Sequence, residues 1–441
     1  METANKADGP RKNIFVVGRD EFNFAKLHSL AAADRYEIHG LLDLSEIRSA
    51  EPCPLDHLLR RAEAQLDEFP GSIDAIVGYW DFPITDLVPV LSQRRNLPSA
   101  SLESVLKCEH KYWSRIESRK VIPEMVPKFL SVDPFDDAQV DNISLDYPYW
   151  LKPIKSFASY LGFRIKNRRD LEAVVPQIRN NIGRLGNEFN DALQRVDLPQ
   201  EVDGVDGLHC IAEEIITGRQ CTVEGYVYSG EVRVYGVVDS FRESNRSTFS
   251  RYQYPSQLPK NVRSRMIDAA ERVMSHIGYD MAPFNVEFFY NADNGKIWLL
   301  EINPRISQSH CDLFEKVDGA SNHKVMIQLA LGEEPTPPTR EGKFKCAAKF
   351  FMRHYGDALV TQTPSENDIQ RVQAEIPDAL IKIGVKEQTR LSELQHQDSY
   401  SFELANVYIG AQNQRDLLKK KERAFELLPF EFTDEERRRA S

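Results

Sequence analysis

The sequence contains few cysteines, and none lies in a pattern typical of a structural or metal-binding site. There are six in 441 residues, with no Cys-x-x-Cys pair and no histidine at a spacing that resembles a zinc site. They are Cys53, Cys108, Cys210, Cys221, Cys311 and Cys346. This excludes a disulfide framework, and we interpret the cysteines as reduced, packed thiols of a cytoplasmic protein.

Long apolar runs and clusters of basic residues are also missing. The apolar runs stop well short of the roughly 20 residues that a membrane span needs. Residues 1–12 are polar, which predicts a disordered leader and not a signal peptide. The net charge is −11 and the pI is about 5.5, and no stretch concentrates enough Lys and Arg to bind a phosphate backbone. We therefore expect neither a membrane nor a nucleic acid as partner.

The composition is otherwise that of an ordinary globular protein. Hydrophobic residues make up 41% of the chain and charged residues 28%, which is close to the average for folded domains. A chain of 441 residues exceeds what one hydrophobic core serves, so we expect two to four domains.

Strands and helices alternate over residues 13–105, which predicts a small Rossmann-like parallel-sheet domain. The strand candidates are IFVVG, YEIHGLLDL and IDAIVGYW, and the segments 21–33, 55–69 and 84–95 have helical spacing. The first strand ends in a lone Gly18, so the glycine spacing of a dinucleotide site is absent. This domain either buttresses its neighbour or faces the substrate.

A second lobe and a long β-meander are expected further along the chain. Segments 107–120, 171–193 and 262–278 have helical spacing. Strands are expected at CIAEEII, TVEGYVYSG and EVRVYGVVDSF. Beyond the Pro-rich run PTPPT, residues 340–430 predict an α+β extension, and residues 431–441 a mobile tail.

The segment FNVEFFYNADNGKIWLLEINPR predicts a hairpin around an Asp-Asn-Gly turn. A three-residue loop over 293–295, with Gly295 left-handed, places Glu287 opposite Glu301. A two-residue Asn294-Gly295 turn would instead put the two acids on opposite faces. In the first register Asn285 also faces Asn303, and the other face is filled by Phe288, Tyr290, Trp298 and Leu300.

Two carboxylates opposite each other on neighbouring strands repel unless a cation lies between them. Mg²⁺ suits such a pair because it binds a few protein oxygens and completes its shell with phosphate oxygens and water. We predict Glu287, Glu301 and Asn303 as the metal ligands, with Mn²⁺ as an alternative ion. The other interpretation is a solvated exposed hairpin. Arg305 follows directly and would stabilise a transferring phosphoryl group or an anionic substrate, or else form a structural salt bridge.

The sequence resembles the ATP-grasp family over residues 107–335. HKYWSR with Lys111 is similar to the family's first nucleotide lysine, and WLKPI with Lys152 to the second. IAEEIITG resembles the hinge that holds adenine, and FNVEF with LEINPR resembles the metal-binding pair. These motifs occur in the same order along the chain as in the family. The resemblance rests on this order more than on any single motif.

The resemblance implies a fold and a set of site residues. The fold would be α/β and α+β multidomain, with the parallel-sheet domain before an ATP-grasp domain over 106–335, whose lid lobe spans about 125–220, and the α+β extension after it. Arg305 and Lys152 would be catalytic. ATP would contact Lys111, Lys152, Ser156, Ser159, Glu213, Glu214, Ile215, Ile216 and Gln220, and Glu224 is added because it shares a strand face with Gln220.

Two positions depart from the family pattern. The phosphate loop reads KSFASYLG, where glycines are usual, and Gln220 stands where a glutamate generally binds ribose. Arg242, Arg246 and Arg251 form either a carboxylate-binding wall or a solvated basic loop.

The function that the resemblance implies is a carboxylate–amine ligase that uses ATP and Mg²⁺, forms an acyl phosphate and releases ADP and phosphate. Its substrates would be a small carboxylate and an amine, with amino acids among the candidates, and a homodimer is the assembly to expect. The alternatives are a kinase or carboxylase of the same fold, and an ATP-binding regulatory module without turnover.

Overall fold

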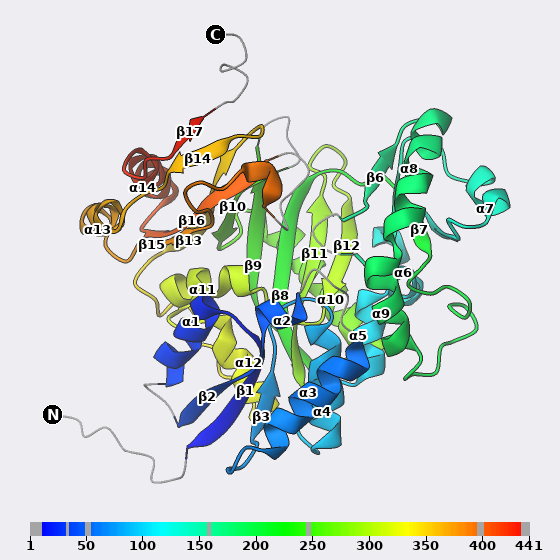
Figure 1. The fold of residues 1–441 in the computed structure, drawn as a ribbon, viewed down its shortest axis with the longest axis horizontal. Helices are drawn as coiled ribbons and strands as arrows, with labels where there is room; N and C mark the ends of the chain where they lie inside the picture. The colour runs from blue at the N-terminus through cyan, green and yellow to red at the C-terminus, as the bar shows by residue number, and fades with distance from the viewer. Residues whose placement is uncertain are drawn as a thin grey trace.

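The computed structural model describes residues 11–31, 35–48, 54–156, 160–243, 248–394 and 401–433. Figure 1 shows a large central sheet with the N-terminal domain below it, a helix-covered lobe on the right and the C-terminal extension at the upper left. Residues 1–10 of the predicted leader and 434–441 of the predicted tail lie outside the described residues. The first tail residues are instead a strand, β17 (Glu431–Thr433), which pairs with β14 (Leu359–Gln362).

The N-terminal domain is a three-stranded parallel sheet in the order β2–β1–β3, as predicted. Its strands are β1 (Lys12–Arg19), β2 (Tyr36–Asp43) and β3 (Ala75–Val77). The interior of β1 is buried on both faces because helices cover the sheet on two sides, which is why its sequence is a continuous apolar run. These helices are α1 (Glu21–Ala31), α2 (Leu44–Ile47), α3 (Leu55–Asp67) and α4 (Ile84–Arg94).

Two short helices connect this domain to the next, where the sequence predicted one helix over 107–120. They are α5 (Leu102–Glu109) and α6 (Lys111–Val121). His110 breaks the helix because its backbone is extended, and its Nδ1 accepts a hydrogen bond from the Trp113 amide at 3.0 Å. Lys111 is therefore the first residue of α6.

The lid lobe contains a four-stranded antiparallel sheet in the order β4–β7–β5–β6. The single helix predicted over 171–193 is two helices, interrupted at Ile182 just before Gly183, a residue of low helix propensity. The elements of this lobe are β4 (Phe129–Val132), α7 (Asp137–Asp141), β5 (Tyr149–Pro153), β6 (Phe163–Ile165), α8 (Arg168–Asn181), α9 (Gly183–Leu193) and β7 (Cys210–Glu214).

The central sheet has eight strands in the order β12–β11–β8–β9–β10–β13–β16–β15. Five come from the middle of the chain: β8 (Arg219–Tyr228), β9 (Glu231–Arg242), β10 (Phe249–Tyr254), β11 (Ala282–Tyr290) and β12 (Ile297–Asn303). One face packs on α10 (Lys260–Ile277) through an apolar core. The opposite face carries polar side chains near β8, β11 and β12, and it forms the candidate site.

The C-terminal extension continues the central sheet through β13 (Cys346–His354), β16 (Phe402–Ala411) and β15 (Leu380–Ile383). Its helices α13 (Glu366–Glu375) and α14 (Gln414–Glu426) pack on these strands. The remaining helices are α11 (Cys311–Asp318), α12 (Asn322–Ala330) and the 3₁₀ turns η1 (Pro123–Met125), η2 (Gln308–His310) and η3 (Leu391–Glu393). The predicted fold, a parallel-sheet domain before mixed α+β lobes, is confirmed.

Among the described residues, no helix combines the length and the apolar character that crossing a bilayer would require.

Candidate active site

The β11–β12 hairpin brings the two predicted metal-binding acids face to face. Glu287 pairs with Glu301 and Asn285 with Asn303 across the two strands, which is the register predicted from the three-residue loop. Both glutamates are half-buried. The polar face of the hairpin therefore presents two carboxyl groups side by side.

The tip of the hairpin differs from the prediction. The loop is longer, with Asn291 and Lys296 hydrogen-bonded across it at 2.9 Å and Gly295 left-handed at φ 68°. Near the tip, Tyr290 pairs with Ile297, one residue out of the predicted register, and a β-bulge beyond Glu287 restores it. Because the bulge shifts the alternation of β12, Ile297 and Leu299 fill the core in place of the predicted Trp298 and Leu300.

The two acids affect each other electrostatically. Burial and the neighbouring Glu301 raise the pKa of Glu287 to about 8, although Gln220 and Arg305 oppose the shift. Gln220 donates its amide to Glu287 Oε2 at 2.5 Å and accepts from Arg242 at 2.7 Å. The ribose contact predicted for Gln220 stays a prediction, and here the side chain joins Glu287 to Arg242.

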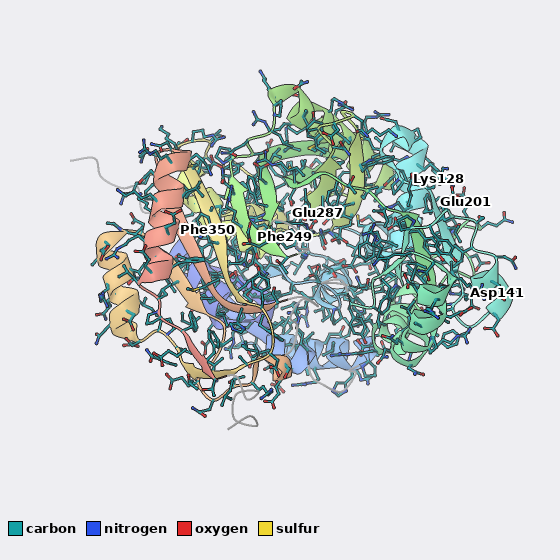
Figure 2. The ribbon with its side chains drawn as sticks, turned by 90° about the horizontal axis from the view of Figure 1, so that it is seen from above. Lys128, Asp141, Glu201, Phe249, Glu287 and Phe350 are labelled. Atoms are coloured by element: carbon teal, nitrogen blue, oxygen red, sulfur yellow. The ribbon has the colours of Figure 1, made fainter. Side chains whose placement is uncertain are left out.

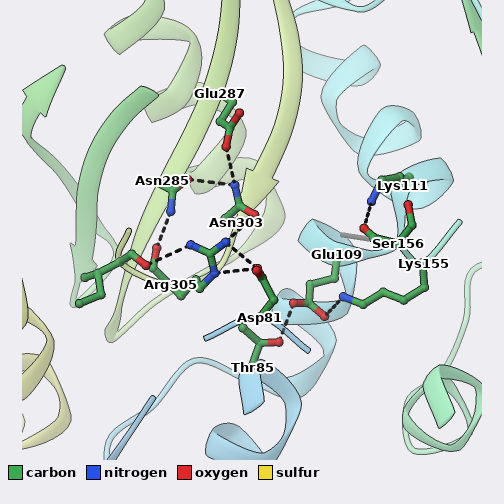
Figure 3. A network of polar contacts seen from close by, with 11 residues as sticks. Asp81, Thr85, Glu109, Lys111, Lys155, Ser156, Asn285, Glu287, Asn303 and Arg305 are labelled. Atoms are coloured by element: carbon green, nitrogen blue, oxygen red, sulfur yellow. Dashed lines mark hydrogen bonds and ion pairs between the residues drawn. The ribbon is translucent and has the colours of Figure 1, made fainter. Parts of the chain in front are cut away.

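Asn303 lies beside the two glutamates, and its side-chain nitrogen points toward Glu287. Its Nδ2 is 3.4 Å from Glu287 Oε1 and 2.9 Å from Asn285 Oδ1, while its Oδ1 is 3.4 Å from an Arg305 nitrogen (Figure 3). The side-chain amide of Asn303 would have to flip, exchanging the places of its oxygen and nitrogen, before the oxygen could bind a cation between the glutamates.

Arg305 joins the core to the N-terminal domain. Its Nε and Nη2 contact Asp81 Oδ1 at 2.7 and 2.5 Å, and Asn285 donates to its carbonyl at 3.0 Å. Burial would lower the pKa of Arg305, but Asp81 and the two glutamates raise it, so the guanidinium stays charged. Figure 3 shows Asp81 reaching it from the segment after β3. The domain first interpreted as structural or substrate-facing thus supplies a carboxylate to the site.

Lys152 and Glu213 form a buried ion pair on neighbouring strands of the lid lobe. Lys152 Nζ is 2.5 Å from Glu213 Oε2, and Arg115 Nε is 2.6 Å from Glu213 Oε1. Burial alone would raise the pKa of Glu213, but the two cations lower it to about 2. Arg115 also donates to the Leu300 carbonyl at 2.6 Å, which joins β7 to the β11–β12 hairpin.

Lys111 and Lys155 lie with Lys152 at the start of the phosphate loop. Lys111 Nζ donates to the Ser156 carbonyl at 2.7 Å, and burial lowers the pKa of Lys111 to about 8. Lys155 pairs with Glu109 at 2.6 Å, and Glu109 accepts from Thr85 at 2.6 Å (Figure 3). Ser159 lies outside the described residues.

The predicted hinge segment is partly exposed to solvent, whereas Glu224 is buried. Glu214 is exposed, and Ile215 and Ile216 are half-exposed between β7 and β8, as an adenine contact would need. Glu224 is fully buried and binds His310 Nδ1 at 2.6 Å and the Tyr235 hydroxyl at 2.9 Å. Its predicted ribose or substrate contact stays a prediction, and these partners give it a structural role.

The donor set fits a divalent cation and a polyphosphate. Glu287 and Glu301 face each other across β11 and β12, and oxygen donors of this kind suit Mg²⁺ or Mn²⁺. The lysines gather at one edge of the same space, where phosphate oxygens would offset their mutual repulsion.

Comparison with known proteins agrees with this geometry. Residues 145–312 match the family model described as an ATP-grasp domain. This stretch is an ATP-grasp domain. It includes Lys152, the predicted hinge and the β11–β12 hairpin. The match leaves the reaction and the substrates of the protein open.

Sequence relatives of this ATP-grasp protein share short segments only. The carbamoyl phosphate synthase large chain of Archaeoglobus fulgidus is 32% identical over 92 residues, which cover 20% of this chain and 8% of that protein. The large chain of Pasteurella multocida is 39% identical over 67 residues, covering 15% and 6%. The chain thus spans less than a tenth of the length of these relatives.

Solved structures share the fold over nearly the whole ATP-grasp chain. The L-amino acid ligase of Bacillus licheniformis has a TM-score of 0.71 at 14% identity, covering 97% of this chain and 100% of that one. The biotin carboxylase domain of the Hydrogenobacter thermophilus 2-oxoglutarate carboxylase, solved with MgADP, ADP and bicarbonate, has a TM-score of 0.66 at 15% identity, with 97% and 92% covered. At these identities the likeness shows the fold.

Sequence analysis missed four residues of the ATP-grasp site: Asp81, Glu109, Arg115 and Lys155. Each acts through a partner far away in the sequence. Arg115 and Lys155 lie within the segments HKYWSR and KSFASYLG, but neither segment indicates a pairing with Glu213 or Glu109.

Proposed function

We propose that this protein is an ATP-dependent carboxylate–amine ligase. In the proposed reaction a carboxylate oxygen attacks the γ-phosphorus of ATP, ADP leaves, and an amine then displaces phosphate from the acyl phosphate. The convergence of Glu287 and Glu301 beside Arg305, opposite a group of lysines, carries the proposal. A cation bound by the two glutamates, together with Arg305, would supply positive charge on one side of the space in which a phosphoryl group moves. The lysines would supply it on the other side.

The residues of the chain would each do a defined part of this work. Glu287 and Glu301, with Asn303 turned over, would hold Mg²⁺, which would neutralise phosphate charge. Lys111 and Lys152 would bind phosphate oxygens. Arg305, oriented by Asp81 at 2.5 Å, would hold the anionic substrate in line and stabilise charge as the new bond forms. The phosphate loop would exclude water once the acyl phosphate exists.

A same-fold kinase or carboxylase is the second candidate. The likeness of the fold to a biotin carboxylase domain favours it. It differs in product, since it would release ADP without forming an amide. The arrangement of Gln220, bound to Glu287 at 2.5 Å, is the observation that favours a regulatory module without turnover.

A screen of ADP release with acids and amines, singly and in pairs, tests the proposal. We expect ADP and phosphate only when both substrates are present, with an amide as product. Glu301→Gln should lower the rate at least about a hundredfold, because it removes one of two cation ligands. Asp293→Asn, at the exposed tip of the same hairpin, is the matched control and should retain the rate. ADP release with a stable phosphorylated product would contradict the ligase assignment.

A further inference from the structure

Lys349, on β13, is a buried lysine that the reaction above does not use. Its side chain is 7% exposed, and its Nζ donates to Ser309 Oγ at 3.2 Å. Among the described residues the other lysines as deeply buried, Lys155 and Lys316, have carboxylate partners at 2.6 Å, whereas Lys349 has none within ion-pair distance. Glu403 attracts the Lys349 ammonium from beyond that distance, and an ammonium buried this deeply would be further stabilised by an anion in direct contact.

Lys349 lies on the same face of the central sheet as the candidate metal ligands. Gln220 pairs with Ser240, Ser240 with Tyr252, and Tyr252 with Lys349, in one row across four strands. Directly opposed residues in such a row project to the same side. Since Gln220 contacts Glu287 at 2.5 Å, the row runs from the metal-binding acids to the C-terminal extension.

The distance along this row suits a second substrate. Three strand steps of about 4.8 Å place the Lys349 backbone roughly 14 Å from that of Gln220. Figure 2 shows Phe249, at the start of β10, between Glu287 and Phe350, the neighbour of Lys349.

Aromatic and charged side chains surround the Lys349 ammonium. The rings of Phe351, Tyr408 and Tyr252 lie 4.7, 5.7 and 5.9 Å from its Nζ. Arg353, further along the same strand, adds a second positive charge, and its guanidinium lies 3.7 Å from Glu403 and donates to Ser401 Oγ at 3.1 Å. Burial lowers the pKa of Lys349 to about 8, and a bound carboxylate would restore it.

Taking the proposed ligase activity as its basis, we propose that the C-terminal extension binds the amine co-substrate through a carboxylate that contacts Lys349. The amine substrate would then be an amino acid or another amino-carboxylate. The extension would position its amine toward the acids of β11 and β12. The Lys349 ammonium would be a binding group that sets substrate class, and it would not take part in phosphoryl transfer.

Steady-state kinetics with matched amine substrates test this inference. For the wild type, we expect an amino acid to have a KM at least about tenfold below that of its carboxamide. Lys349→Met should remove this difference by raising the KM for the amino acid, while the KM for ATP stays unchanged. Lys349→Arg should restore part of the preference. Lys386→Met is the control, because Lys386 is an exposed lysine of the extension, and it should behave as wild type.

The outcomes separate the two proposals. Absence of ADP release with every pair of acid and amine would overturn the ligase assignment and this inference together. Amide formation by the wild type with equal use of acid and carboxamide would overturn the inference alone. So would a Lys349→Met variant that keeps the wild-type preference. Thermal unfolding with and without MgATP shows whether the variant is folded and still binds nucleotide.

Discussion

Asp86, in the first turn of α4, is fully buried, and neither carboxyl oxygen has a hydrogen-bond donor within the described part of the chain. Burial raises its pKa well above the ordinary 3.8, and the neighbouring Glu109 raises it further, while Lys155 opposes the shift. We infer that Asp86 keeps its proton to a higher pH than an ordinary carboxyl group does. A protonated Asp86 adds no negative charge beside the ion pair of Lys155 and Glu109.

Replacing Asp86 by Asn should stabilise the protein above neutral pH. A carboxyl group with a raised folded pKa contributes most below its ordinary pKa of 3.8, and the contribution is lost as the pH rises through the raised value. Asn keeps the shape without the charge, so we expect the free energy of unfolding to increase by about 1 kcal/mol or more in alkaline buffer. Urea unfolding across pH measures it. Asp268→Asn, an exposed acid on α10, is the control, and equal curves for both variants would contradict a raised pKa of Asp86.

Arg115 stabilises the hinge by two contacts that few other side chains could replace. Arg115→Leu leaves Glu213 with Lys152 as its cation and removes the donor to the Leu300 carbonyl. Breaking a buried pair in this way should cost about 3 kcal/mol of unfolding free energy. Arg168→Leu, which breaks ion pairs of an exposed side chain, should leave the unfolding free energy nearly unchanged, because water screens such pairs. Chemical denaturation of both variants provides the comparison.

At the scale of elements, Gly218 separates the hinge from β8. Its φ is 141°, and a Cβ there would lie 2.3 Å from the Tyr290 carbonyl on β11. Gly230, in the β8–β9 turn, also has a positive φ, 78°, but open space around it. Both positions restrict side chains, and only the first has no room for one.

Alanine at these two glycines should therefore have different effects. Gly230→Ala should lower the free energy of unfolding by about 1 kcal/mol, because alanine is strained in a left-handed backbone conformation. Gly218→Ala should cost more, because β8 and β11 must move apart, and it should weaken nucleotide binding at the hinge. Thermal unfolding and titration with MgATP measure the two effects. Similar losses in both variants would show that the contact with Tyr290 is unimportant.

The elements that sequence analysis predicted well are those with local signals. The opposition of Glu287 and Glu301 followed from alternation and a turn, and the parallel sheet from alternating strands and helices. The bulge in β12 was missed because it depends on the loop from Asn291 to Lys296, in which two asparagine side chains bind backbone amides at 2.9 and 3.0 Å. The ion pair of Asp81 with Arg305 joins residues more than 200 positions apart, and no local pattern encodes it.

At the scale of the molecule, the continuous eight-stranded sheet predicts that the extension does not unfold separately. β10 and β13 share a register of four residue pairs, so loss of β13 would leave β10 as an unpaired edge. We expect β13 and β16 to exchange their amide hydrogens at the same denaturant concentration as β8 and β11. Native-state hydrogen exchange with mass spectrometry measures this. Earlier exchange in the C-terminal strands would show an independent unit.

The β-bulge beyond Glu287 has a consequence for how the hairpin tolerates change. Glu287 and Glu301 pair in one register, and the residues near the hairpin loop pair in another. The loop residues therefore do not determine the direction in which the two glutamate side chains point. Insertions or deletions at the tip could be absorbed by moving or erasing the bulge. Related chains could therefore vary this loop in length and still keep the pair of acids aligned.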